Sequence, residues 1–242
     1  MMKNTALRRL ILIATIGGLA GIFIFPLNPV NSLTTKALFL GSLVGTWVGL
    51  LILMWGKTYL RFAIAGIPFL VAILVLFTGR PVDSVQLESD YVARLRSFED
   101  TPYEWGGESS RGIDCSGLPR RAFRDALLSQ GLRGLNGTAI RLFFGQWWFD
   151  ASAGALGESY RDYTVPLAVK GTILEMDHSP LRRGDLAVSV GGAHILAYVG
   201  DGYWIQADPG LGKVSTLHSR EDSNFWFEGP VTTHRWRLLN EN

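Results

Sequence analysis

The sequence has very little cysteine, with a single thiol, Cys115, in 242 residues. A disulfide within the chain needs a second cysteine, and the common structural zinc sites use cysteine pairs, so both uses are excluded here. Cys115 is then a reactive thiol, an inert buried thiol or a bridge to another molecule. It lies where a glycine-rich loop, residues 106–113, is predicted to turn into a helix, and this position favours a nucleophile.

Negative charge is absent from the first third of the chain. All 21 Asp and Glu residues lie at or after Asp83, whereas six of the 23 Lys and Arg residues precede Thr78. The same third contains three apolar stretches, residues 10–25, 37–55 and 62–77, each close to the roughly 20 residues that cross a bilayer. The sequence therefore predicts a membrane region with three transmembrane helices over residues 1–79, followed by a linker over residues 80–90.

The basic residues of this region predict its orientation. Lys3, Arg8 and Arg9 precede the first stretch, Lys57 and Arg61 separate the second from the third, and the first loop offers only Lys36. Basic loops stay in the cytoplasm, so the part after residue 79 is expected on the extracytoplasmic side of the membrane. A cleaved signal peptide is the alternative for the first stretch, although no small-residue cleavage site follows it.

Residues 91–242 form one expected domain with a core of its own. After Thr78 the net charge is −4, from 17 basic and 21 acidic residues, which does not indicate a nucleic-acid partner. A helix over 91–98 and a second one from the cysteine to about Leu128, stopped by Gly131, are predicted first. Strands over 186–190, 195–199, 203–207 and 231–238 follow, and this order predicts an α+β fold with an antiparallel sheet packed on the cysteine helix.

The segment of residues 134–180 has the weakest pattern. Its aromatic residues concentrate in 139–149 and would cover more than half of a helix. Core packing or a groove wall is the first interpretation, and contact with a membrane surface or a lid over the site is the second.

A catalytic cysteine must become a thiolate, and the start of a helix favours this form. Asp114 or Ser116 is able to cap the predicted helix and leave Cys115 in its first turn, where backbone N–H groups would also hold an oxyanion. Pro119 has no N–H to donate, so the regular helix is expected to begin at Ser116 or later.

The best candidate for the base is His194, at the mouth of an apolar strand after a glycine turn. With residues 200–202 as a three-residue loop, Val199 pairs with Tyr203, and Gln206 falls on the same face as His194 as a diagonal neighbour. Asp208 lies opposite His194 in this register and competes with Gln206 as the residue that orients the imidazole. A two-residue turn would move Gln206 to the other face.

Four motifs in order resemble the NlpC/P60 cysteine peptidases: residues 102–107, residues 114–118, residues 181–186, and finally His194 with Gln206. The resemblance implies a papain-like α+β fold without a metal or organic cofactor. It also implies cleavage of peptidoglycan stem peptides, typically at the γ-D-glutamyl to diamino-acid linkage. Position by position, it implies that the nucleophile is Cys115, the base His194 and the third residue Gln206, and that the substrate is contacted by Tyr103, Trp105, Asp114 and Ser116.

Three functions remain open on the sequence. The first is a membrane-anchored thiol peptidase, the second an amidase or acyltransferase acting on a lipid or wall substrate, and the third a catalytically silent wall-binding scaffold. Peptidoglycan and the bilayer are the expected partners. Uncontrolled wall cleavage would be lethal, so a restraint is expected, either from an unidentified regulatory protein or from the segment 134–180.

Overall fold

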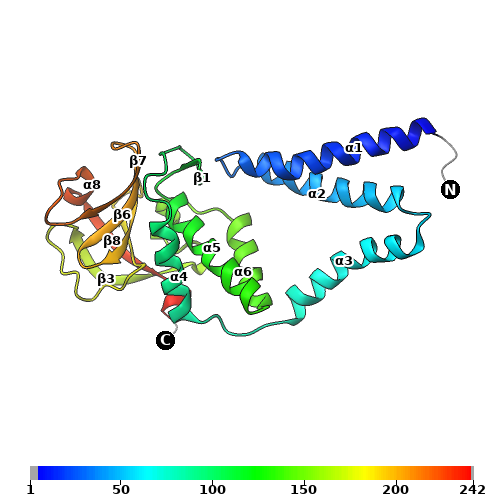
Figure 1. Cartoon of the computed structure of the whole chain (residues 1–242). Coiled ribbons are helices and arrows are strands. Elements are labelled where there is room, and N and C mark those ends of the chain that lie inside the picture. Colours follow the sequence, from blue (N-terminus) through cyan, green and yellow to red (C-terminus); the bar gives the residue numbers. More distant parts are fainter. Residues whose placement is uncertain (1–4, 241–242) are drawn as a thin grey trace.

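The computed structural model describes residues 5–240, so Lys3 lies outside the described residues. Three long apolar helices precede a mixed domain, and the two parts lie at opposite ends of an elongated molecule (Figure 1). The apolar helices are α1 (Thr5–Ile24), α2 (Leu33–Leu53) and α3 (Thr58–Phe77), with the short 3-10 helix η1 (Phe25–Leu27) between the first two. All three are long and apolar enough to cross a membrane.

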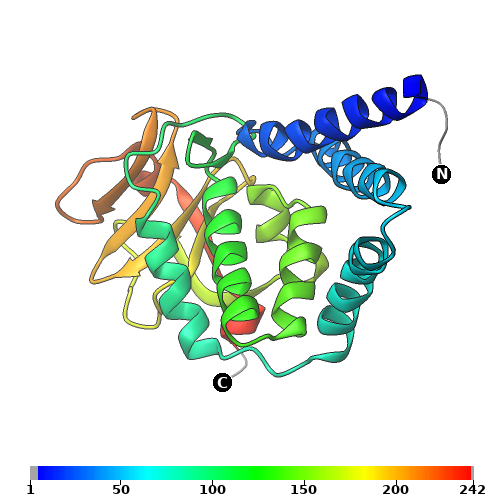
Figure 2. The ribbon, with the colours of Figure 1, turned by 45° about the vertical axis from the view of Figure 1, so that its right-hand side comes forward.

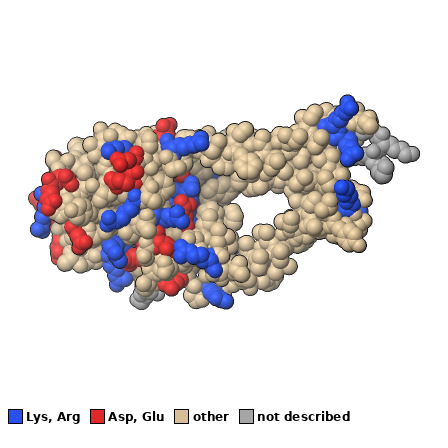
Figure 3. Space-filling view, viewed as in Figure 1, with Lys and Arg blue, Asp and Glu red and all other residues tan. Residues whose placement is uncertain are grey.

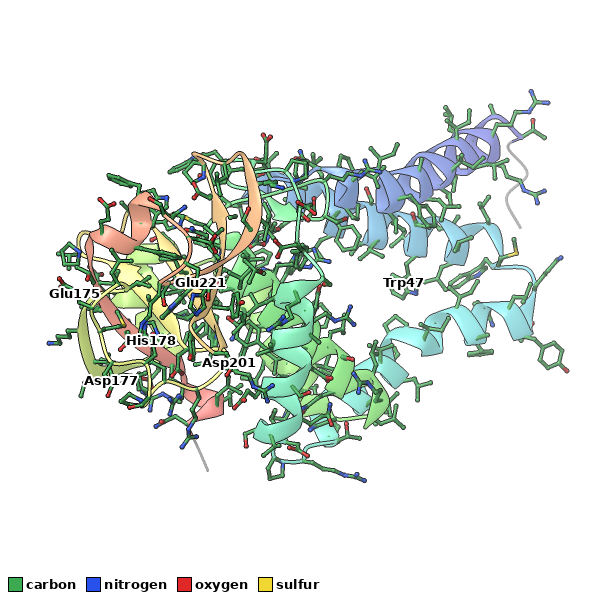
Figure 4. All side chains as sticks on the ribbon, turned by 60° about the vertical axis from the view of Figure 1, so that its left-hand side comes forward. Trp47, Glu175, Asp177, His178, Asp201 and Glu221 are labelled. Carbon is green, nitrogen blue, oxygen red and sulfur yellow. The ribbon has the colours of Figure 1, made fainter. Side chains whose placement is uncertain are left out.

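Helices α1 and α2 pack closely because small residues face each other. A side chain at Gly21 would collide with Ser42, and one at Gly49 would collide with Thr15. This is the way helices approach in a membrane, where small residues bring the backbones together. Helix α3 diverges from this pair and has no buried residue, although Trp47 of α2 reaches across and donates its indole N–H to the Ile64 carbonyl at 2.9 Å (Figure 4).

Charge is distributed along the molecule as the sequence predicts. In the space-filling view, Asp and Glu gather on the domain, and a group of Lys and Arg marks the far end of the apolar helices, with uncharged surface between the two (Figure 3). An opening separates α1 and α2 from α3 in the same view.

The domain begins with α4 (Ser84–Arg96), which starts inside the segment 80–90 predicted as a linker because Leu87 is fully buried. Two short strands, β1 (Glu108–Ser109) and β2 (Gly112–Ile113), pair before α5 (Gly117–Arg133). Three helical elements follow: α6 (Gly137–Trp148), α7 (Ala153–Gly157) and η2 (Tyr160–Asp162). Figure 2 shows α4, α5 and α6 side by side over the sheet.

A six-stranded antiparallel sheet forms the rest of the domain, in the order β3-β8-β4-β5-β6-β7. Its strands are β3 (Thr164–Thr172), β4 (Leu186–Ser189), β5 (Ile195–Gly200), β6 (Tyr203–Asp208), β7 (Lys213–His218) and β8 (Pro230–Trp236). The helix α8 (Phe225–Glu228) lies between β7 and β8, and η3 (Arg237–Leu239) follows β8. The α+β fold with an antiparallel sheet against the cysteine helix is confirmed.

The larger core lies between the helices and the sheet. Phe123 of α5 stacks on Trp236 of β8 with 4.3 Å between ring centroids, and Tyr91 of α4 meets both rings edge-on. Asp185, from the 181–186 motif, is buried and accepts two hydrogen bonds from the Arg235 guanidinium at 2.7 Å. This motif therefore fixes β4 to β8.

Two details of the predicted elements are wrong. Gly131 lies inside α5 and does not stop it, because α6 approaches so closely that a side chain there would collide with Ile140; Gly134 ends the helix instead. Strands β3 and β7 were not predicted, and they are the two edges of the sheet.

Candidate active site

The loop before α5 presents Cys115 just outside the helix. Ser116 is the N-cap residue, so Cys115 precedes the first turn and does not lie in it as predicted. Asp114 holds this loop: its carboxylate accepts hydrogen bonds from the Gly106 N–H, the Gly117 N–H and the Ser116 hydroxyl. Pro119 occupies the third helical position, where a missing N–H costs nothing because the first four N–H groups have no partner within a helix.

His194 lies at the start of β5 with its imidazole almost fully enclosed, at 1% exposure. The Ser189 hydroxyl accepts a hydrogen bond from the His194 N–H at 2.9 Å, which fixes the backbone. The indole of Trp226 stacks on the imidazole, with 4.0 Å between centroids and 12° between planes. The fixed backbone and the stacked indole together hold the imidazole in one orientation.

Gln206 on β6 holds the imidazole through its side-chain oxygen, which lies 2.6 Å from His194 Nε2. The Gln206 amide nitrogen donates to Asp208 Oδ2 at 3.4 Å, and Asn224 donates to the same oxygen at 2.7 Å. Since the amide oxygen can only accept, Nε2 of His194 carries the proton and Nδ1 has a free lone pair. Asp208 thus orients Gln206, and no hydrogen bond joins it to His194.

The hairpin has the predicted register along its body and a different one at its turn. Ala197 pairs with Ile205 and Tyr198 with Trp204, as the three-residue loop requires. At the turn, Gly200 pairs with Tyr203 in place of Val199, because Gly200, Asp201 and Gly202 all adopt positive φ and introduce a bulge. Gln206 consequently stays on the face of His194.

Burial keeps the thiol and the imidazole neutral at rest. Desolvation, followed by the Asp114 carboxylate, raises the pKa of Cys115 to about 11, while N–H groups of Ile195, Ser116 and Cys115 hydrogen-bond the sulfur and oppose this. Desolvation lowers the pKa of His194 to about 4, against the stabilising effect of Gln206 on the charged form. At pH 7 the thiol of Cys115 is therefore protonated, and the imidazole of His194 is neutral and able to accept a proton.

Tyr103 is half-buried beside the thiol. Its pKa is raised to about 12 by burial and then by the proximity of Cys115, Asp114 and Asp208. Trp105 is 80% exposed and lies on the outside of the same loop. Asp114 and Ser116 use their polar atoms within the loop, so the structure brings Tyr103, Asp114 and Ser116 to the thiol and places Trp105 at the rim.

Two contributors were missed by the sequence analysis. Trp226 and Asn224 belong to a segment without strong periodicity, and only the folded chain brings them against His194 and Asp208. Asn224 could have been predicted as a helix N-cap, because asparagine is favoured at that position. Its side-chain oxygen accepts a hydrogen bond from the Trp226 N–H at the start of α8. Nothing in the sequence pointed to the stacking.

The other histidines lie apart from this arrangement. His178 hydrogen-bonds the Ile173 carbonyl and lies at the end of the domain away from the apolar helices, in the same region as Glu175 and Asp177 (Figure 4). His234 bonds with Thr232 on β8. Within residues 5–240, no group of three His, Cys, Asp or Glu side chains is arranged to hold a metal ion.

Alkylation of the only cysteine tests the protonation state directly. With a pKa of about 11, the thiolate fraction of Cys115 rises about tenfold for each pH unit between 7 and 10. We expect the rate of iodoacetamide labelling, followed by intact mass, to rise in the same way. The urea-unfolded chain is the control, since an ordinary thiol with a pKa near 8.5 levels off above about pH 9. A native profile that also levels off there would contradict the neutral resting pair.

A family model described as the NlpC/P60 family matches residues 100–229, more than half of the chain. The chain belongs to the NlpC/P60 family. The matched region contains Cys115, His194 and Gln206 together with Tyr103 and Trp226. The resemblance read from the four sequence motifs is thereby confirmed.

Several solved structures are similar to the chain. The peptidoglycan hydrolase RipB from Mycobacterium tuberculosis is 24% identical, with 62% of this chain and 65% of that one covered and a TM-score of 0.38. The P60 domain of an antigen from M. avium subspecies paratuberculosis is 20% identical, covering 62% and 96%, with a TM-score of 0.34. NlpC2 from Trichomonas vaginalis is 17% identical, covering 64% and 48%, with a TM-score of 0.42. This chain thus covers just under two thirds of RipB and about half of NlpC2. No curated protein sequence matches it.

Proposed function

We propose that the protein is a membrane-anchored cysteine peptidase that hydrolyses peptidoglycan stem peptides, with the γ-D-glutamyl to diamino-acid linkage as its bond. The observation that carries the proposal is the geometry around His194. A neutral imidazole whose Nε2 is held by Gln206 has a free lone pair at Nδ1, and the N–H of the next residue, Ile195, hydrogen-bonds the sulfur of Cys115 within an NlpC/P60 domain. RipB, a similar protein, is named as a peptidoglycan hydrolase, which supports the choice of substrate.

In the proposed mechanism, Cys115 is the nucleophile and His194 the general base. As the sulfur bonds to the scissile carbonyl carbon, its proton moves to Nδ1 and the carbonyl electrons move to oxygen. The C–N bond then breaks, and the leaving amine takes the proton from His194. Water attacks the resulting thioester, gives a proton to His194, and releases the acid while the thiol is restored.

Gln206 is the positioning residue in this proposal. Its oxygen keeps the proton on Nε2 while Nδ1 works, and it stabilises the imidazolium that forms during the reaction. A glutamine carries no charge, so it leaves the pKa of His194 low at rest. The N–H groups of Cys115 and Ser116, which bond the sulfur at rest, would hold the developing oxyanion.

The substrate groove is proposed at the mouth of the Cys115 loop. Tyr103 and Trp105 offer an aromatic surface to the peptide, and Asp114 and Ser116 shape the loop from beneath. The exposed indole of Trp105 is the outermost of these groups.

The proposed location is the bacterial cytoplasmic membrane, with residues 1–79 as its membrane region and residues 91–242 as the catalytic domain. The three apolar helices carry basic residues at the end remote from the domain (Figure 3), and the α1–α2 loop contacts the domain through Pro29 and Asn31. Three spans with a cytoplasmic amino terminus would place the domain outside, where peptidoglycan lies.

The test uses the full chain in detergent, incubated with purified muropeptides and analysed by mass spectrometry. We expect two new fragments whose masses sum to the substrate plus one water and identify the bond. The Ser97→Ala variant, at an exposed position on the end of α4, should cut at the same rate. A ligated lipid product would replace the peptidase with an acyltransferase. If the protein is folded and the muropeptides remain intact, the peptidase and the acyltransferase are both overturned, and the wall-binding scaffold remains.

A further inference from the structure

A cavity of about 540 Å³ lies where the apolar helices meet the domain. It is lined by η1, the α1–α2 loop, α2, β1, α5 and α6, and Cys115 is not among its lining residues. Six residues of its apolar wall come from α2 and α6: Phe39, Leu40, Leu43, Phe143, Phe144 and Trp147. The sequence favoured core packing or a groove wall for the aromatic residues of α6, with membrane contact or a lid as the second interpretation, and three of them line this cavity.

The depth of this wall fits one leaflet. Lys36, near the start of α2, is buried and paired with Asp150 of the domain at 2.6 Å. Leu43 lies seven residues further along α2, or about 10 Å at 1.5 Å per residue, and half of the hydrocarbon core is about 15 Å. The cavity therefore runs from the polar surface of the domain to a depth where acyl chains lie.

The polar end of the cavity carries an excess of positive charge. Arg121 and Arg124 of α5 line it together with Glu108 and Asp125. With Lys36, Arg120 and Asp150, which complete the same ionic network, four basic side chains face three acidic ones. Arg124 is 2% exposed, and its Nη1 has no hydrogen-bond partner. The side chain of Arg121 is 38% exposed.

The network leaves two buried donors, Arg120 Nη1 and Arg124 Nη1, without a hydrogen-bond partner against a single acceptor without one, Glu108 Oε1. An unsatisfied buried guanidinium nitrogen is costly, so this excess of donors points to a further acceptor. A phosphodiester is such an acceptor, and it pairs well with a guanidinium fork. The apolar wall beside it suits an acyl chain, and the aromatic residues of α6 suit the boundary between headgroups and chains.

We propose that this cavity binds one phospholipid with an anionic headgroup, taken from the leaflet on the side of the domain. The phosphodiester lies at Arg121 and Arg124, and an acyl chain lies along Leu40, Leu43 and Trp147. The inference rests on the membrane insertion of α2 in the proposed function and is independent of the proposed peptidase activity.

Native mass spectrometry of the full chain, released from detergent micelles, tests the proposal. Phosphatidylglycerol and phosphatidylcholine with the same acyl chains are added separately at equal concentration, and polyprenyl phosphate is added in a third sample. We expect one retained phosphatidylglycerol with roughly tenfold preference over phosphatidylcholine. Both lipids present a phosphodiester, but phosphatidylcholine adds a cationic group beside the excess positive charge of the cavity. Equal retention of the two, or stronger retention of polyprenyl phosphate, would overturn it.

Two variants locate the binding. Leu43→Trp fills the apolar wall and should lose the retained lipid, while Leu50→Trp, seven residues along the same face and similarly exposed, does not line the cavity and should keep it. Arg121→Gln leaves the wall intact and should remove the preference between headgroups. Unchanged retention in Leu43→Trp together with an unchanged preference in Arg121→Gln would reject the site. Lipid retention by Cys115→Ala should match that of the wild type. The lipid result can therefore be interpreted even if the peptidase assay fails.

Discussion

Replacement of Cys115 by alanine is expected to abolish muropeptide cleavage, with a loss of about 10³-fold or more in kcat/KM. No other thiol exists in the chain. The hydroxyl of the next residue, Ser116, donates its proton to Asp114 and is a far weaker nucleophile. His194 and Gln206 would keep their hydrogen bond, so the base would remain in place without a proton to take.

The fold should survive this change. Cys115 is a small side chain at 7% exposure on the edge of the core, so its truncation to alanine costs about 1 kcal/mol or less. Thermal unfolding of wild type and variant, measured by circular dichroism, should agree within a few degrees. Cleavage that persists in Cys115→Ala would assign the chemistry to another group and remove the thiol mechanism. Cleavage lost together with the folded state would call for Cys115→Ser as the second variant.

Replacement of Glu108 by alanine is expected to give the largest loss of stability, about 3–5 kcal/mol. Glu108 is 3% exposed and is bound by Arg120 at 2.9 Å, Arg124 at 2.8 Å and Asn31 at 2.7 Å. Without it, two guanidinium groups remain buried without their shared carboxylate. The midpoint of thermal unfolding should fall by roughly 6–20 °C for a chain of this size.

A matched control for this experiment is Glu221→Gln. The Glu221 side chain is 74% exposed and makes only a long contact with His218, so its loss should change the stability by less than about 0.5 kcal/mol. An equally small effect for Glu108→Ala would show that the arginines find other partners and that the cluster is not a structural centre.

The pH dependence of unfolding follows from the same cluster. Burial alone would raise the pKa of Glu108, but Arg120 and Arg124 outweigh it and hold the pKa below the ordinary 4.5. A lowered folded-state pKa contributes stability that is present above pH 4.5 and is lost as the pH falls through the folded value. The difference in stability between wild type and Glu108→Ala should therefore narrow below about pH 4.5.

The strands that the sequence predicted are the inner ones, and the reason is their burial. Strands β4, β5 and β8 are almost continuously buried and carry an apolar pattern. The missed strands, β3 and β7, are the edges of the sheet, where one side of the strand faces solvent. Pro166 and Gly171 in β3 and the polar residues of β7 are ordinary at an edge, and they weaken the local signal.

The site residues that the sequence predicted lie close together in the chain, whereas the contacts that it missed join distant segments. His194 and Gln206 are joined by a short hairpin, so turn geometry was enough to place them on one face. The choice between Gln206 and Asp208 depended on Asn224, which is held by a different segment. Lys36 was read only as a loop charge, and its partner Asp150 lies 114 residues away, beyond any local pattern.

Two connections join the apolar helices to the domain, and they would fix the height of the site above a membrane. The chain enters the domain through residues 78–83, and the first turn of α2 is separately tied to it by Lys36 and Asp150. With α1 to α3 in a bilayer, a domain attached at two points does not swing as it would on a single flexible tether. Its reach is then set by its own dimensions, and such an enzyme would cut only the layer of wall that lies directly against the membrane.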